Sequence, residues 1–424
     1  MSYKYEELDK RLISVVPSTR QVEYQQREFY GFIHFTVNTY TNKEWGLGDE
    51  SPEIFNPYDL DAESWVKAAV SAGMQGLILT CKHHDGFCLW PSKYTEHSVK
   101  NSPYKDGKGD IVKELSDACK KYGIKFGVYL SPWDRNCAVY GTGKEYDDFY
   151  INQMTELLTN YGDVYTFWMD GACGEGPNGK KQVYDWERYY AKVRELQPEA
   201  VLSICGPDVR WCGNEAGVVR KSEWSVVSKL MTSPAFTAEL SQKEDNEEFR
   251  KRAIDPTNEE LGSREVLENE PELAWYPAET DLSIRPGWFY HPEEDDKVRS
   301  LENLKDIYLK SVGGNTALLL NVCPMKNGRF HENDTKRLAE LGDFIRESFK
   351  DNLADKAEII SVPEKGDRGE DISSVRVDDY ETYFKTEDGK RELCIELKWE
   401  EGVKASYLVL KENILLSQRV ETFK

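Results

Sequence analysis

The chain has 424 residues, of which 39% are hydrophobic and 12% aromatic, enough for one large domain and a smaller companion rather than a disordered polymer. Its formal net charge is −21, and that much negative charge repels nucleic-acid phosphates and anionic membrane surfaces. We therefore exclude nucleic acid and membrane surfaces as partners and expect a neutral or cationic one.

The sequence shows no export or membrane segment. Its first residues, MSYKYEELDKRLISVV, lack the apolar core of a secretion signal, and no apolar run reaches the roughly 18 residues of a membrane span. The nine cysteines are scattered without a C-x-x-C pair, a pattern typical of reduced thiols. These features predict a cytoplasmic protein.

Apolar, strand-like runs alternate with amphipathic, helix-like segments through the first 350 residues. The strand-like runs are residues 29–35, 76–81, 125–130, 164–170, 200–205 and 316–322. The helix-like segments are residues 61–73, 110–123, 146–162, 182–197, 297–311 and 333–350. Apolar strands separated by helices indicate a parallel sheet covered on both faces, so we predict a (β/α)8-like barrel. A doubly wound sheet is the alternative, but no G-x-G-x-x-G follows the first strand.

Two regions depart from this alternation. Residues 229–272 are highly charged and irregular, and we expect a surface excursion there. After residue 350, four runs alternate with turn residues as antiparallel strands do: residues 356–362, 373–379, 391–402 and 404–414. We therefore predict a barrel domain over residues 1–350 and a small antiparallel β-sandwich domain, incomplete at this length, over residues 351–424.

Polar residues gather where the predicted strands end, which is where a barrel of this class carries its active site. They are His34, His83, His84, Asp85, Tyr129, Ser131, Trp168, Asp170, Cys205 and Asp208. Trp168 and Asp170 are two residues apart on one strand, so their side chains point to the same side. Asp170 is a candidate nucleophile or base, and a helix-capping acid is an equally good interpretation.

The histidines admit three interpretations. His34, His83 and His84 have the donor atoms of a metal site, although zinc ligands are more often spaced as H-x-H or H-x-x-x-H. Neutral imidazoles also donate and accept hydrogen bonds at once, which suits sugar hydroxyls. The residues favour carbohydrate binding and leave a metal site and a structural role open; Asp85 is expected to turn the loop with Gly86.

Glycosyl transfer to water needs a second carboxylate. Residues 206–225, GPDVRWCGNEAGVVRKSEWS, offer Glu215 among glycines that allow close substrate approach, with tryptophans nearby. Glu223 and Asp208 compete with it, and the residues favour Glu215 only modestly.

Five stretches together carry a family resemblance: FIHFTVNTYTNKEWG, KHHDGFCLWPSKYTEHSV, FWMDGA, RWCGNEAG and WYPAETDLSIRPGWFYH. Over residues 25–350 the sequence resembles bacterial α-L-fucosidases of glycoside hydrolase family 29. The GNEAG and ETDLSIRPGWFYH stretches resemble the subfamily that cleaves α-1,3- and α-1,4-linked fucose from branched, Lewis-type sugars.

The resemblance implies roles for individual residues. Asp170 matches the nucleophile and Glu215 the general acid/base of a retaining double displacement. The positions matching the fucose pocket are His34, Glu44, Trp45, His83, His84 and Trp168, with Trp288 against the sugar ring and, more loosely, Tyr129 and Arg210. The residues of a second sugar subsite do not follow from the resemblance, and Glu279, Asp281, Asp134 and Asn136 are candidates by loop position alone.

The implied substrate is a fucosylated oligosaccharide, and the implied chemistry needs no cofactor and no metal ion. The resemblance leaves two alternatives to test: a metal-dependent barrel hydrolase that uses His34, His83 and His84, and a non-catalytic carbohydrate-binding barrel. Members of the family usually carry a full β-sandwich after the barrel, whereas this sequence stops at ILLSQRVETFK, which resembles the middle of one.

Overall fold

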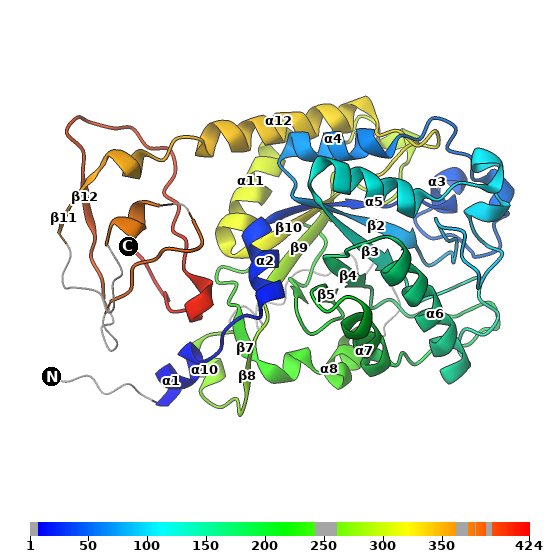
Figure 1. The fold of residues 1–424 in the computed structure, drawn as a ribbon, viewed down its shortest axis with the longest axis horizontal. Helices are drawn as coiled ribbons and strands as arrows, with labels where there is room; N and C mark the ends of the chain where they lie inside the picture. The colour runs from blue at the N-terminus through cyan, green and yellow to red at the C-terminus, as the bar shows by residue number, and fades with distance from the viewer. Residues whose placement is uncertain (1–6, 242–260, 362–371, 378, 387–391) are drawn as a thin grey trace. The chain divides into compact units, whose positions relative to one another are not determined.

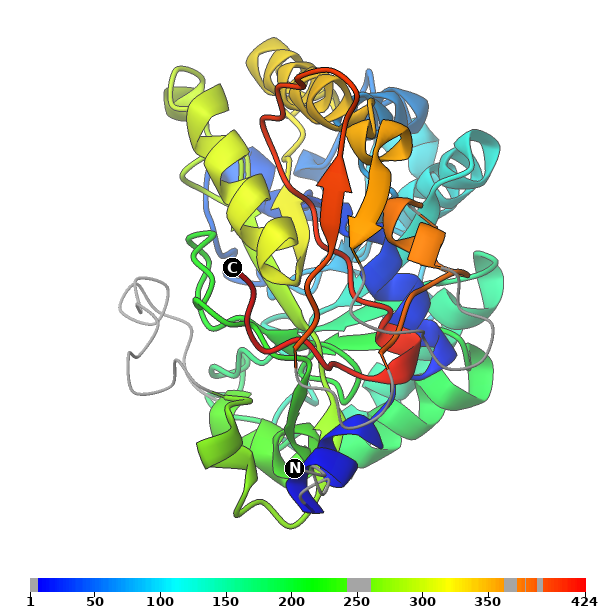
Figure 2. The same cartoon turned by 90° about the vertical axis from the view of Figure 1, so that its left-hand side faces the viewer.

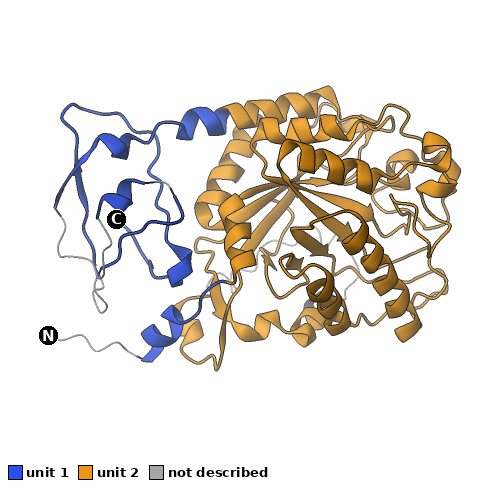
Figure 3. Cartoon of the chain, in the orientation of Figure 1, with its two compact units in different colours: residues 1–17, 344–424 blue, residues 18–343 orange. Residues whose placement is uncertain are grey.

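The computed structural model describes residues 7–241, 261–361, 372–377, 379–386 and 392–424. The chain divides into two compact units, residues 18–343 and residues 1–17 with 344–424 (Figure 3). The domain boundary predicted between residues 350 and 351 stays a prediction.

Residues 18–343 alternate strands and helices along the chain (Figure 1). The strands are β1 (Phe29–Ile33), β2 (Gly76–Lys82), β3 (Lys125–Leu130), β4 (Thr166–Met169), β5 (Val201–Ile204), β6 (Arg210–Trp211), β7 (Val226–Ser228), β8 (Leu273–Trp275), β9 (Ala278–Ser283) and β10 (Thr316–Asn321). The helices are α2 (Thr19–Arg27), α3 (Val37–Thr41), α4 (Ala62–Ala72), α5 (Ile111–Tyr122), α6 (Lys144–Asn160), α7 (Trp186–Leu196), α8 (Pro234–Ser241), α10 (Arg264–Leu267), α11 (Leu301–Ser311) and α12 (Glu332–Phe349), which crosses into the second unit.

Eight strands form one parallel sheet in the order β5-β4-β3-β2-β1-β10-β9-β6. A parallel bridge between Ser203 and Val209 joins its two ends and nearly closes it. The helices surround the strands in both views (Figures 1 and 2). The predicted (β/α)8-like barrel is confirmed.

The closure between β5 and β6 uses no helix. The chain turns at Ile204, whose φ of 70° lies in the left-handed region, and the Ile204 amide donates to the Val209 carbonyl at 2.8 Å. The sequence analysis missed β6 and β9. The first is two residues long, and the second, AETDLS, carries acidic residues on a strand buried throughout, so neither shows an apolar run.

Local signals set the ends of the barrel helices. Asp61 accepts from the Glu63 amide at the start of α4, and Gly73 ends the helix with a φ of 90°. Asp110 and Gly123 do the same for α5, where the glycine φ is 71°. Aspartate side chains satisfy free amides at a helix start, and glycine adopts the left-handed end without a Cβ clash.

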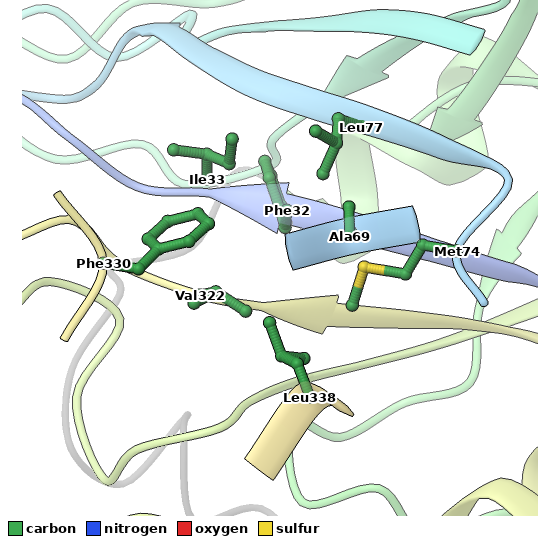
Figure 4. A pocket seen from close by; sticks show the side chains of 9 residues that line it. Phe32, Ile33, Ala69, Met74, Leu77, Val322, Phe330 and Leu338 are labelled. Carbon is green, nitrogen blue, oxygen red and sulfur yellow. The ribbon is translucent and has the colours of Figure 1, made fainter. Parts of the chain in front are cut away.

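A small apolar gap, too narrow to hold a water molecule, lies against β1, with side chains from α4, β2 and α12 (Figure 4). Its lining residues are Gly31, Phe32, Ile33, Ala69, Met74, Leu77, Val322, Phe330 and Leu338. A Cβ added to Gly31 would lie 2.5 Å from Leu77 Cδ2 and 2.7 Å from Met74 Sδ, so a larger residue there would have to displace these two side chains. We call this space the outer cavity.

The unit formed by residues 1–17 and 344–424 contains α1 (Glu7–Ile13) and one antiparallel pair, β11 (Glu358–Ser361) with β12 (Glu396–Lys398). These strands fall within two of the four predicted runs. The other two predictions are wrong: residues 372–376 form a 3₁₀ helix, and no strand forms over residues 404–414. Of the predicted charged excursion, residues 242–260 lie outside the described residues, and the flanking parts form α8 and α10.

Candidate active site

A polar cavity with about 40 Å³ open to water lies where the barrel strands end. Its lining residues are Phe32, His34, Glu44, Trp45, His83, His84, Tyr129, Trp168, Asp170, Glu215, Asp281 and Trp288. The structure therefore brings together ten of the eleven residues predicted for catalysis and substrate binding, the exception being Arg210. We call this space the polar cavity.

Asp170 follows β4 and is held by hydrogen bonds to both of its oxygens. Tyr129 Oη donates to Oδ2 at 2.8 Å, and the Ala172 amide donates to Oδ1 at 2.7 Å. His84 Nε2 lies 3.8 Å from Oδ2. Burial, with the nearby Asp170, raises the pKa of Tyr129 well above its usual value, so Tyr129 remains a hydrogen-bond donor. These contacts fix the direction of the carboxylate.

Glu215 lies in the loop after β6, and the indole of Trp288 donates to its Oε2 at 3.0 Å. The glycines around it support the turn that brings it to the cavity, since Gly213 and Gly217 have φ values of 107° and 76°. The rings of Trp288 and His34 lie 5.0 Å apart, and Trp288 both contacts Glu215 and lines the polar cavity.

Glu44 holds the segment that carries Trp288. Its carboxylate accepts from the Trp288 and Phe289 amides at 2.9 and 3.1 Å, and it pairs with His291 Nε2 at 2.7 Å. Burial acts to raise the pKa of Glu44, but His291 and the two amides outweigh it and lower the pKa. Glu44 is thus an anion that joins two walls of the polar cavity.

The two adjacent histidines lie directly beyond β2, with ring centroids 4.0 Å apart. His84 Nδ1 contacts Ser131 Oγ at 2.7 Å, and Ser131 donates its proton to the Trp133 carbonyl, also at 2.7 Å. His84 therefore donates from Nδ1. Asp85 lies behind this loop, accepting from Thr36 and from the Phe87 amide, which agrees with its predicted role in the turn.

Arg210 and the competing carboxylates have structural partners instead. Arg210 donates to Glu223 at 2.8 Å, and both side chains are buried. Burial acts to raise the pKa of Glu223, but Arg210 and Arg220 lower it overall. Asp208 pairs with Arg194 and accepts from the Leu202 amide. Arg210 does not line the polar cavity, and its predicted part in sugar binding stays a prediction.

The four candidates for a second sugar subsite separate. Asp281, on β9, lines the polar cavity and accepts from Trp211 Nε1 at 2.7 Å. Glu279, on the same strand, is buried beneath it and accepts from Tyr24 and Trp168. Asp134 pairs with the buried Lys82 at 2.8 Å, and Asn136 donates to the Gly48 carbonyl. Asp281 is the one of the four that faces the cavity.

Sequence reasoning missed the part that Phe32 plays and placed Asp281 only by its loop position. Phe32 lies two residues before His34 on β1, and that spacing was the available signal, because alternate residues of a strand share a face. Among the described residues, no group of three or more His, Cys, Asp or Glu side chains has the arrangement of a metal site.

Comparison with known proteins adds independent information. Residues 13–348 match the sequence model of the family described as alpha-L-fucosidase. The chain is 39% identical over 411 residues to alpha-L-fucosidase 1 of Arabidopsis thaliana, covering 96% of this chain and 76% of that protein.

Solved structures agree. A Bacteroides ovatus protein aligns with a TM-score of 0.73 at 48% identity, covering 86% of this chain and 61% of that one. A Ruminococcus gnavus fucosidase in complex with fucose aligns with a TM-score of 0.74 at 34% identity, covering 89% of this chain and 77% of the other. Helices of the described residues are all too short or too polar to cross a membrane. With most of its length matched in sequence and in structure, the chain belongs to the α-L-fucosidase family.

Proposed function

We propose that the chain is a retaining exo-α-L-fucosidase that hydrolyses α-1,3- and α-1,4-linked fucose from branched oligosaccharides. The observation that carries the proposal is the polar cavity, where Asp170 and Glu215 share one space with the histidines and tryptophans expected to bind fucose. Family membership supports the reaction class, and the contacts of the two carboxylates support their roles.

In this mechanism Asp170 attacks the anomeric carbon and forms a glycosyl–carboxylate ester. Glu215, initially protonated, gives its proton to the departing glycosidic oxygen, which leaves as a hydroxyl. Glu215 then takes a proton from water, whose oxygen attacks the same carbon and returns Asp170 to its anionic form. Tyr129 and the Ala172 amide each donate to one oxygen of Asp170, which holds the carboxylate in one orientation.

The proposed linkage preference rests on the two sequence stretches that contain Glu215 and Trp288. The stretches GNEAG and ETDLSIRPGWFYH meet, because Trp288 Nε1 donates to Glu215 at 3.0 Å. Asp281 belongs to the second stretch and lines the same cavity, so it is the candidate of the four that can bind a second sugar unit.

The test is fucose release from a Lewis-type trisaccharide and from an aryl α-L-fucoside, with the wild type and Asp170→Asn in parallel. Asn keeps the size of the side chain and an oxygen for the Ala172 amide. We expect faster release from the trisaccharide and a loss of at least about a thousandfold in the variant with both substrates.

Each other outcome has a defined meaning. Faster release from the aryl substrate would refute the linkage preference and retain the fucosidase. Unchanged release by Asp170→Asn would remove Asp170 as nucleophile. No release by the wild type would refute the proposed function, and loss of activity with a chelator would favour the metal-dependent alternative.

A further inference from the structure

Asn321, the last residue of β10, is fully buried and lies at the centre of a hydrogen-bond network that includes residues of the polar cavity. Its amide nitrogen donates to Ser283 Oγ at 2.9 Å and to the Trp288 carbonyl at 2.8 Å. Its amide oxygen contacts His34 Nδ1 at 2.9 Å. Side chains at the ends of β1, β9 and β10 are joined by this one residue.

The direction of every bond in the network is determined. Ser283 has one hydroxyl proton, which it donates to the Gly287 carbonyl at 2.7 Å, so Ser283 accepts from Asn321. A carbonyl only accepts, so the second amide proton of Asn321 goes to Trp288. Both protons face these acceptors, and the amide oxygen must therefore face His34 and accept from Nδ1.

A proton on Nδ1 decides what His34 offers to the polar cavity. Burial lowers the pKa of His34 to about 4, although Asn321 and the carboxylates of Glu44 and Asp170 oppose the change and His84 adds to it. The ring is therefore neutral at neutral pH, with a single N–H. Since Asn321 holds that proton at Nδ1, Nε2 carries a lone pair.

We propose that Asn321 is a positioning residue that holds His34 in its Nδ1–H tautomer, so that Nε2 accepts a hydrogen bond from a hydroxyl of the bound sugar. The part of this proposal that concerns the sugar rests on the proposed function. The consequence is a directional requirement. The ligand must present a donor at this position, and a group that can only accept, such as an ether or a fluorine, is disfavoured there.

The tautomer is measured by 15N NMR of the full chain labelled at histidine, with the His34 signal assigned by its loss in His34→Gln. We expect an unprotonated Nε2 and a protonated Nδ1 at neutral pH, the reverse of the tautomer that free histidine prefers. A protonated Nε2 in the wild type would overturn the proposal. This measurement uses no substrate and no Asn321 variant. It therefore tests the tautomer of His34 independently of whether the chain hydrolyses fucosides.

Asn321→Asp tests the role of the amide. The carboxylate keeps the shape and the acceptor but favours the doubly protonated ring, so we expect the pKa of His34 to rise and Nε2 to become a donor as pH falls. KM for the fucoside should rise by about tenfold on the acidic side of the new pKa, with a smaller change in kcat. A uniform loss of activity without a shifted pH profile would indicate a merely structural residue and refute the proposal.

Ser283→Ala is the matched control. It removes a neighbouring bond of the same network and leaves the amide oxygen of Asn321 facing His34. We expect the Nδ1–H signal of His34 to persist. Its conversion to the Nε2–H tautomer would show that the whole network, and not Asn321, sets the proton, which contradicts the assignment.

Discussion

Two cavities border the same barrel strand and differ in almost every property. The outer cavity is lined by apolar residues alone, whereas the polar cavity gathers four carboxylates and three histidines. Phe32 of β1 lines both. A single residue of β1 thus lies between an apolar region that contributes to stability and a polar region suited to chemistry.

The two linings also differ in their effect on the free energy of folding. Apolar side chains in the outer cavity stabilise the barrel by their burial. Burial raises the pKa of Asp281, in the polar cavity, well above its usual value, and the charges of Glu215 and Glu279 add to the effect. Burial also raises the pKa of Glu279, beneath the cavity, to about 7. Burying carboxyl groups close to one another costs free energy of folding, so these residues do not serve stability. Such groups are typical of functional sites.

The largest expected effect is a loss of activity from a substitution in the polar cavity. Glu215→Gln keeps an acceptor for Trp288 but removes the acid, so we expect kcat/KM for the trisaccharide to fall by about 10² to 10⁴. An aryl fucoside with a good leaving group needs less protonation and should lose much less. Unfolding in urea should change little.

Glu223→Gln is the control for that prediction, because Glu223 competed with Glu215 in the sequence and pairs with Arg210 in the structure. It should lower stability and leave the ratio of rates on the two substrates unchanged. If Glu223→Gln changes that ratio and Glu215→Gln does not, the two assignments are reversed.

The next effect concerns the outer cavity. Leu338→Ala removes a buried side chain of α12 from its lining, and we expect a loss of about 3 kcal/mol in the free energy of unfolding with kcat/KM unchanged. Urea unfolding and fucoside kinetics measure both. Leu47→Ala, at a residue that is 49% exposed, should change stability by no more than about 0.5 kcal/mol. A large loss of activity in Leu338→Ala would show that the two cavities are coupled.

The smallest expected effect concerns how the buried acid Glu279 changes the free energy of unfolding with pH. The folded pKa of Glu279, about 7, exceeds its ordinary value of 4.5, so the unfolded chain releases this proton at lower pH than the folded one. The contribution of Glu279 to stability is therefore full below pH 4.5 and is lost as pH rises to 7, by about 3 kcal/mol at most.

Glu279→Gln mimics the protonated acid and should flatten this part of the profile of unfolding free energy against pH. Urea unfolding on either side of the window measures it, with Glu332→Gln on the exposed face of α12 as control. Parallel profiles for the wild type and Glu279→Gln would contradict the raised pKa.

The sequence predicted the barrel well because its strands are apolar runs between capped helices. The run at 125–130 corresponds residue for residue to β3, and the ends of α4 follow from Asp61 and Gly73. β9 was missed because it carries acidic residues, which have low strand propensity and interrupt the apolar pattern of a buried strand. The strand predicted over residues 404–414 fails because alternation alone supplies no pairing partner.

The candidate site was predicted from strand ends and from the family resemblance, and its limits are equally specific. His34 and Asp170 follow apolar runs and were visible directly. Arg210 is the one residue predicted for catalysis or substrate binding that does not line the polar cavity, because a motif gives the position of a residue along the chain but not the direction of its side chain, which is set here by Glu223. Asn321 went unnoticed because an asparagine after an apolar run resembles an ordinary turn residue.

The position of Asn321 also bears on how the protein is made. Walls of the polar cavity come from residues as far apart as His34 and Trp288, and the residue that joins them is the last of the final barrel strand. A chain growing on the ribosome therefore lacks a finished binding site until residue 321 has emerged and β10 has paired with β1. Partial translation products carry Asp170 and Glu215 but not the assembled site, so sugar recognition arises late in synthesis.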